Sequence, residues 1–284
     1  MPLFTTLEGV DARVDARSQR QGMESDMDAR PRRAIGAAAA LLAVSAFMAI
    51  GAATAGAEVV YNNVPSPLPG NFASIGLAAT SSTEFGGEIE LAGTARSQPT
   101  ITVVMSSWAC QSGGWNTSNC MTPKPNRTFK VPVTIRVYNV GELEEGPIAE
   151  RTKTFKMKYR PSEDAVHCTP GHWYDATTAE CFHGLAFPIA ITLTKLKKMP
   201  KRSVITVAYP HSSGPAESLN VSTSEPPENT LSVGAQPVEE WFANSTSPEM
   251  YCPGATDVGK LGPEQGVGCQ ESINYQPVFA VSAN

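Results

Sequence analysis

The sequence lacks the short motifs by which many enzymes and metal-binding proteins are recognised. It has no G-x-S-x-G nucleophile elbow, no D-x-[DN]-x-[DN]-G calcium loop and no C-x₂₋₄-C pair of the kind that binds zinc. His211 stands beside Ser212-Ser213-Gly214, but that run is typical of a turn rather than of a serine–histidine pair. No constellation of residues amounts to a catalytic signature, so function has to be inferred from architecture and from candidate binding residues.

Helical periodicity is also lacking, apart from residues 234–243, where one short helical turn is expected. Apolar and polar residues instead alternate with a period of two, which is typical of half-buried antiparallel strands. The clearest runs are 101–105, 131–137, 155–159 and 185–193, and the shorter candidates are 87–92, 203–209, 217–223 and 275–282. About nine strands with short, Gly- and Pro-containing turns and no crossover helices predict an all-β fold. We expect an antiparallel β-sandwich, with a jelly roll as one candidate connectivity.

The N-terminal part has the features of an export signal. Arg30, Arg32 and Arg33 precede an uncharged, Ala- and Gly-rich stretch that ends in Ala55-Gly56-Ala57. A basic region, a short apolar core and small residues before the cleavage point make a secretory signal peptide. The alternative is an uncleaved transmembrane anchor, which the abundance of alanine disfavours.

One domain boundary follows from this signal. We expect residues 1–57 to be an N-terminal extension with a signal peptide, and 58–284 to be a single β-sandwich domain that is secreted, or extracellular and retained at the cell envelope. No membrane span is expected after cleavage. Translation from Met27 would leave an ordinary signal peptide, with the first 26 residues untranslated.

The charge balance argues against general binding of nucleic acid. Residues 58–284 hold 16 Lys and Arg against 21 Asp and Glu, which equals the net charge of −5 of the whole chain. The distribution is uneven, since 124–202 carry 14 basic and eight acidic side chains whereas 203–284 carry one and nine. Because these segments are free to interleave in a sandwich, no charged face is expected from the imbalance.

All six cysteines lie in the part expected to be exported, where an oxidising compartment favours disulfides. Their spacing suggests three loop-closing pairs among about fifteen connectivities: Cys110–Cys120, Cys168–Cys181 and Cys252–Cys269. The alternative is a zinc site among His167, Cys168, His172, Cys181 and His183, whose spacing fits zinc poorly. We expect disulfides, no metal and no other cofactor, and a thiol count on the purified protein distinguishes the two.

The most distinctive block of the sequence is Tyr61-Asn62-Asn63-Val64-Pro65-Ser66-Pro67-Leu68-Pro69-Gly70-Asn71. This block and several weaker ones resemble a family of secreted bacterial proteins that is common in actinobacteria. Weaker blocks include Glu84-Phe85-Gly86, Met105-Ser106-Ser107-Trp108 and Tyr159-Arg160-Pro161-Ser162. The blocks extend from about residue 59 to the C-terminus. The resemblance implies an extracellular β-sandwich and supplies no activity, cofactor or catalytic residue.

The prolines of the opening block have a physical consequence of their own. Pro65, Pro67 and Pro69 lack the N–H that a central strand donates, so they suit an extended segment lying over the sandwich. A ligand for the groove of a partner protein is the less favoured alternative.

Aromatic side chains near the cysteines are the best candidates for ligand binding. Trp115 is flanked by glycines, and Trp173 with Tyr174 lies between Cys168 and Cys181. Exposed rings on closed loops would stack on sugar rings, because a flat apolar face with a polar edge suits an amphipathic ring. The alternative is that these rings pack against their own disulfides, which is strongly expected for Trp108 at a strand end.

Three classes of function remain. We expect a non-catalytic protein that binds carbohydrate or is adhesive, its partner being a cell-wall or environmental polysaccharide. A structural module that contacts a surface protein is the first alternative. A glycan hydrolase is the second, since paired carboxylates perform that reaction. The adjacent acidic pairs are Glu144/Glu145, Glu163/Asp164 and Glu239/Glu240. Each is expected to be solvated, so no catalytic residue is assigned.

Overall fold

A computed structural model describes residues 56–224, 231–237, 241–247, 249, 259–263 and 276–284. All of them belong to one compact unit. Among these residues no helix is long and apolar enough to cross a membrane. Residues 1–55, Glu239, Glu240, Cys252 and Cys269 lie outside the described residues, so the structure does not test the predicted signal peptide or the third disulfide.

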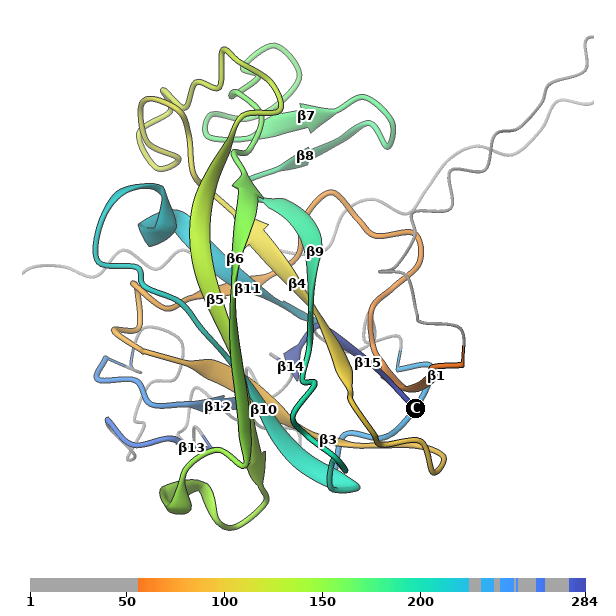
Figure 1. The fold of residues 1–284 in the computed structure, drawn as a ribbon. Coiled ribbons are helices and arrows are strands. Elements are labelled where there is room, and N and C mark those ends of the chain that lie inside the picture. Colours follow the sequence, from red (N-terminus) through yellow and green to blue (C-terminus); the bar gives the residue numbers. More distant parts are fainter. Residues whose placement is uncertain (1–55, 225–230, 238–240, 248, 250–258, 264–275) are drawn as a thin grey trace, which may run out of the picture. The chain divides into compact units, whose positions relative to one another are not determined.

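The described part is an all-β, sandwich-like structure built from antiparallel sheets (Figure 1). Nine strands have five residues or more: β1 (Glu58–Asn62), β3 (Phe85–Glu90), β4 (Thr100–Ser107), β5 (Thr128–Asn139), β6 (Ala149–Lys158), β9 (Leu185–Thr192), β10 (Arg202–Ala208), β11 (Leu219–Ser224) and β15 (Phe279–Ala283). Six are shorter: β2 (Ser74–Gly76), β7 (Trp173–Asp175), β8 (Glu180–Phe182), β12 (Trp241–Ala243), β13 (Gly262–Pro263) and β14 (Gln276–Pro277). The sandwich prediction is confirmed, and the jelly-roll connectivity stays a prediction.

Two large sheets form the layers. The first has the order β1-β15-β4-β11-β14, with β9 also paired to β4 and β2 to β11. The second has the order β13-β12-β3-β10-β5-β6, and β7 and β8 form a separate hairpin. Short 3₁₀ turns at Leu143–Glu145 and Gly214–Ser218 lie in the connections.

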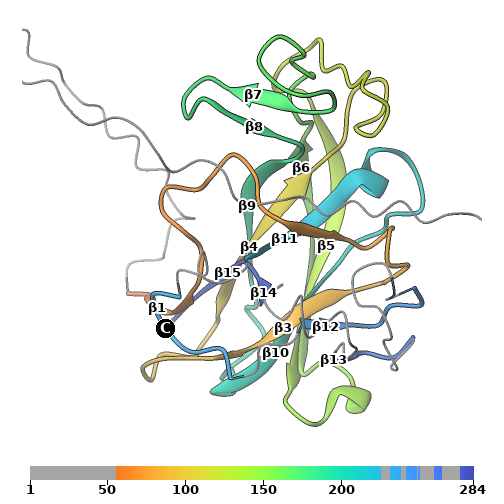
Figure 2. The ribbon, with the colours of Figure 1, turned by 180° about the vertical axis from the view of Figure 1, so that it is seen from behind.

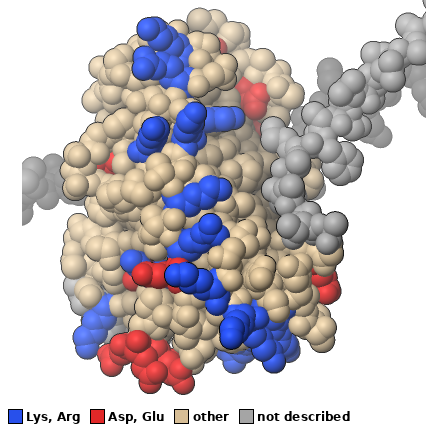
Figure 3. Space-filling view, viewed as in Figure 1, with Lys and Arg blue, Asp and Glu red and all other residues tan. Residues whose placement is uncertain are grey.

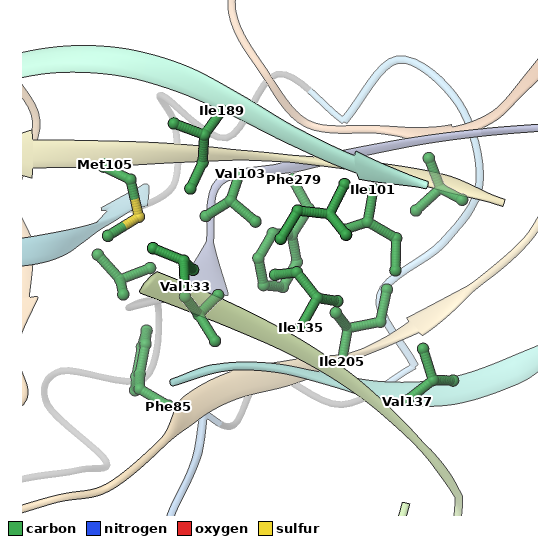
Figure 4. Packing of buried hydrophobic residues seen from close by; sticks show 14 of the residues in the cluster. Phe85, Ile101, Val103, Met105, Val133, Ile135, Val137, Ile189, Ile205 and Phe279 are labelled. Atoms are coloured by element: carbon green, nitrogen blue, oxygen red, sulfur yellow. The ribbon is translucent and has the colours of Figure 1, made fainter. Parts of the chain in front are cut away.

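The apolar residues of the alternating runs face one another between the two sheets. Ile101, Val103 and Met105 of β4 point across the sandwich toward Val133 and Ile135 of β5 (Figure 4). These five side chains are fully buried. Complete burial of such a side chain contributes about 1.5–3 kcal/mol relative to exposure, so this layer is the main source of stability.

The alternation fails for β4, which we expected to have a polar, solvent-facing side. Thr102 is 7% exposed and Ser106 is fully buried. β4 is central in its sheet, with β9 paired to one edge and β15 and β11 to the other. The proline-rich segment, residues 64–73, then crosses its outer face, as shown by the hydrogen bond from Ser106 Oγ to Asn71 Oδ1.

One other local prediction was wrong where the structure describes it. The expected helical turn at 234–243 includes Trp241, which is 1% exposed and lies in β12, paired with β3, while residues 238–240 lie outside the described residues. The loop closed by Cys168 and Cys181 contains the paired strands β7 and β8, which no alternating run predicted.

Two of the three predicted disulfides are present. Cys110 bonds to Cys120 with Cα atoms 5.4 Å apart, and Cys168 bonds to Cys181 with Cα atoms 5.8 Å apart. These separations are ordinary for disulfides. The described cysteines are therefore disulfide-bonded, and they do not form the alternative zinc site.

Candidate ligand-binding site at the disulfide end

Three segments that are distant in the sequence meet at one end of the sandwich. They are the proline-rich segment, the loop 108–123 and the segment 159–184, and we call this region the disulfide end. Figure 2 shows the proline-rich segment, in orange, passing below the β7–β8 hairpin. Backbone hydrogen bonds fix the arrangement: Ala186 N donates to Gly70 O, and Glu163 N donates to Cys120 O.

Trp108 lies at the centre of this end, immediately after β4. Its indole Nε1 donates a hydrogen bond to Ser106 Oγ at 3.0 Å, and Ser106 Oγ donates in turn to Asn71 Oδ1 at 2.6 Å. Its backbone N–H donates to Ser218 O at 2.8 Å. The ring orientation is therefore fixed from both the strand and the proline-rich segment.

Two glycines are required for this packing. A Cβ on Gly184 would lie 2.4 Å from Ser106 Oγ, 2.6 Å from Trp108 Nε1 and 2.8 Å from Asn71 Oδ1. A Cβ on Gly70 would lie 2.5 Å from the ring of Phe182. Only glycine lets the proline-rich segment and the start of β9 approach the aromatic rings this closely.

Aromatic rings surround Trp108. The His183 ring stacks on it with 11° between planes and 5.2 Å between centroids, and Trp115 meets it edge-on at 4.7 Å. The His172 ring packs on the His183 ring, with the two ring centroids 3.6 Å apart. Such pairs contribute about 0.5–1.5 kcal/mol beyond burial and hold the rings in place.

Burial and charge both act on the His183 imidazole. Removal from water lowers its pKa below the ordinary value, and the neighbouring charges of His172 and Arg160 lower it further. The same end contains Arg160, which is fully buried and whose pKa burial lowers to about 10, while the Glu163 carboxylate acts in the opposite direction. His183 is thus kept mainly neutral near pH 7 and is suited to hydrogen bonding rather than to charge pairing.

Three adjoining hollows open around Trp108. The largest, about 690 Å³, lies between the proline-rich segment and the β8 side of the hairpin, and its lining includes Asn71, His172 and Phe182. Two others, about 350 Å³ each, are lined by both Trp108 and Trp115. The volumes are typical of sites for small molecules, and the lining combines apolar rings with a few polar groups.

The three predicted binding residues have different positions. Trp115 is 37% exposed and lies at the hollows. Trp173 is 6% exposed and its Nε1 donates to Gly184 O at 2.6 Å, so its ring is committed to the hairpin and the expectation that it stacks on a ligand is not supported. Tyr174 is half-buried and stacks on His167 with centroids 4.6 Å apart, outside the lining of the described hollows.

Other site residues were not selected from the sequence. His172 and His183 are noticeable there only as members of a histidine-rich loop, and Phe182 and Asn71 carry no signal of their own. Of the adjacent carboxylate pairs, Glu144/Glu145 and Glu163/Asp164 are described and neither lines the described hollows, where the acidic groups are Glu180 and Glu217. The pair Glu239/Glu240 lies outside the described residues. The hydrolase alternative therefore gains no support from those pairs.

A scan against protein-family models, a search of curated proteins and a search of solved structures each find no match. The resemblance of the opening block to secreted actinobacterial proteins stays a prediction. Its most specific residues are nevertheless those of β1 and of the proline-rich segment that lines the largest hollow.

Proposed function

We propose that this chain is a secreted, non-catalytic β-sandwich protein that binds carbohydrate at its disulfide end. The observation that carries the proposal is Trp115, a large apolar ring that stays 37% exposed while it is held edge-on against Trp108. Tryptophan is strongly buried on average, so a ring fixed at the surface beside a hollow needs an explanation. A sugar ring, with its apolar face and polar edge, suits both the indole and the polar groups around it.

The chemistry of the lining supports an uncharged or weakly charged glycan. Asn71, Glu180 and the two imidazoles supply hydrogen-bonding groups, while Phe72 and Phe182 supply apolar area. The hollow extends along the proline-rich segment from Pro65 to Ala73, an elongated lining that favours several sugar units over a single small molecule.

The covalent structure supports an extracellular location. The two disulfides are consistent with an extracellular protein, because such bonds persist in oxidising surroundings. The predicted signal peptide would bring the chain there, and peptide mapping of the mature N-terminus tests cleavage after Ala57.

The test is a pull-down of the oxidised protein on insoluble cell-wall and plant polysaccharides. Trp115→Ala is expected to weaken retention at least about fivefold, since removing one aromatic ring that stacks on a nucleic-acid base costs about 1–3 kcal/mol and we expect a similar cost for a sugar ring. Trp115→Phe keeps a ring and should retain part of the binding. Ile148→Ala, a truncation of a 41% exposed apolar residue beyond the other end of β6, is the matched control.

Trp173→Ala gives a second contrast. Because Trp173 is buried, its loss is expected to lower the melting temperature rather than to remove binding selectively. Absence of retention on every glycan, with the protein folded, would refute carbohydrate binding.

Two exposed apolar residues favour a protein partner as the second candidate function. Val166 is 87% exposed and lies two residues before Cys168, and Met121 is 51% exposed and directly follows Cys120, so both lie next to a disulfide. Flexible methionine and aliphatic side chains are typical of protein-contact surfaces. Crosslinking at the cell surface that depends on Met121 and Val166, with Trp115→Ala still active, would favour this function over carbohydrate binding.

A further inference from the structure

Basic side chains are concentrated on the β5–β6 hairpin. Residues 121–141 and 151–162 together hold nine Lys and Arg and no Asp or Glu. Figure 3 shows blue side chains along the face that β5 and β6 form, with acidic side chains most numerous at its lower end. Part of the basic excess in the sequence does gather on one surface, contrary to our expectation, because β5 and β6 are consecutive, directly paired strands. Arg160 is buried and does not contribute to that surface.

The ladder places three lysines together at one end of this hairpin. Lys130 of β5 lies directly opposite Lys156 of β6, and Lys158 follows two residues along on the same outward face. Directly opposed Cβ atoms lie about 4.5–5.5 Å apart, and alternate residues of a strand lie about 6.6 Å apart. We call Lys130, Lys156 and Lys158 the basic cluster.

Nothing in the described part of the chain neutralises this cluster. All three side chains are exposed, and none forms an ion pair with a described residue. Elsewhere the same ladder uses opposite charges, since Arg136 lies across from Glu150 with Nε and Oε2 3.2 Å apart. Like charges directly opposite each other destabilise a sheet, so the basic cluster does not serve folding.

We propose that the basic cluster binds a linear polysaccharide that carries carboxylates. A chain with regularly spaced anions lying on this face would relieve the repulsion between Lys130 and Lys156, and Lys158 would extend the contact along the strand. Arg127 and Lys124, exposed in the segment just before β5, continue the positive charge toward the disulfide end.

The surrounding surface argues against other polyanions. The outward neighbours on the hairpin are Pro132, Thr134 and Thr154, whereas Phe155 and Met157 lie on the opposite face. No aromatic ring is therefore placed among the three lysines for base stacking, and no large apolar side chain for insertion into a membrane. The choice of a polysaccharide among polyanions rests on the function proposed above.

The experiment measures binding of the oxidised protein to polygalacturonate at low ionic strength. Polygalacturonate whose carboxyl groups are fully methyl-esterified is the neutral comparison. The protein should bind the acidic polymer, and the affinity should fall as the salt concentration rises. The reason is that binding releases counterions from the polymer, and added salt opposes this release. Replacing Lys130, Lys156 and Lys158 together by Gln is expected to weaken binding by about tenfold or more, from the loss of three charge contacts.

The matched control replaces Lys195, Lys197 and Lys198 by Gln. It makes the same change in net charge in the exposed segment after β9. The C-terminal end of β9 lies beside Arg151, because Arg151 Nη1 donates a hydrogen bond to Thr192 O. Arg151 and Lys158 lie near opposite ends of β6, so the control lysines are remote from the basic cluster. An equal loss of affinity in both triple variants would overturn the proposal, since net charge alone would then explain binding.

Two further readouts are decisive. The variant of the basic cluster should melt at the same temperature as the parent or higher, because a repulsive pair is removed; a lower melting temperature would overturn the argument. Binding to duplex DNA or to anionic phospholipid vesicles that is tighter than to polygalacturonate would overturn the choice of partner. So would no binding to the acidic polymer at all.

The two proposals fail separately. Trp115→Ala should leave binding to polygalacturonate largely intact, while the variant of the basic cluster should leave retention on neutral glycans intact. Loss of acidic-polymer binding in Trp115→Ala but not in the lysine variant would refute the basic cluster and leave the carbohydrate site standing. Absence of neutral-glycan binding with a normal lysine effect would refute the carbohydrate site alone.

Discussion

Gly184→Ala is the substitution that most directly tests how Trp108 is held. The added methyl group would lie within 2.8 Å of Ser106 Oγ, Trp108 Nε1 and Asn71 Oδ1. These atoms form the two hydrogen bonds that orient the indole. Each bond contributes about 0.5–1.5 kcal/mol, so displacing both costs about 2 kcal/mol in the free energy of unfolding. For a domain of this size that corresponds to a fall in melting temperature of about 4–8 °C.

A double-mutant cycle with Ser106→Ala separates steric overlap from general disruption. Ser106→Ala alone removes both hydrogen bonds and should cost about 1–2 kcal/mol, since it leaves buried partners unpaired. It also removes the atom nearest to the new methyl group, 2.4 Å away. The double variant should therefore be more stable than the sum of the two single costs predicts, by about 0.5–1 kcal/mol or more.

The assay is thermal unfolding followed by circular dichroism, with tryptophan fluorescence as a local probe. Gly184→Ala should shift the emission, because Trp108 moves relative to Trp115 and His183, and it should weaken glycan retention. Strictly additive costs in the cycle, or a melting temperature of Gly184→Ala equal to that of the parent, would refute the account of Trp108.

Two more predictions concern the disulfide end. The pKa of His183 is lower in the folded state, so the unfolded chain binds the proton more readily. The free energy of unfolding should therefore have its full value above the unfolded pKa near 6.5 and should fall as pH drops below it. His183→Gln should reduce the change in stability between pH 7.5 and pH 5. If thermal unfolding shows the same change between these two pH values for the parent and for His183→Gln, the assignment to His183 is contradicted. Replacing Cys168 and Cys181 by Ser opens a loop of sequence separation 13 and should lower the free energy of unfolding by about 3 kcal/mol. Protease cleavage between β7 and β8 is the local readout. An unchanged melting temperature in the double variant would show that packing alone holds the hairpin.

The alternating pattern in the sequence predicts the strands that have one face in the core and one face toward solvent. The runs 131–137 and 185–193 became β5 and β9 because one face of each strand meets the core and the other is more open. The run 101–105 also predicted β4, but the prediction that its polar side faces solvent was wrong, because both faces of this strand are covered. The alternation gives no signal where a strand is only three residues long, as in β7 and β12. Short strands depend on their neighbours in space, and no local pattern encodes those neighbours.

Some residues of the candidate site could also be identified from the sequence, and others could not. Trp115 was identifiable because flanking glycines keep a loop away from the core. Trp173 has similar loop surroundings, and its burial depends on an acceptor, Gly184 O, that lies on the far side of the hairpin. The pairing of His172 with His183 likewise arises from the turn of that hairpin, eleven residues apart in the chain.

Not every basic residue of the β5–β6 hairpin needs a ligand to explain it. β6 is the last strand of its sheet, and unpaired edges invite association with other chains. Arg151 and Lys153 lie on the same side of β6 as Met157, which is buried. Charged side chains that point inward at an edge are a known protection against such association. Lys130 gives no such protection, because it lies on β5, which is paired on both sides by β6 and β10. Its position opposite Lys156 adds only repulsion, so these two residues and Lys158, rather than the total charge of the strand, indicate an anionic partner.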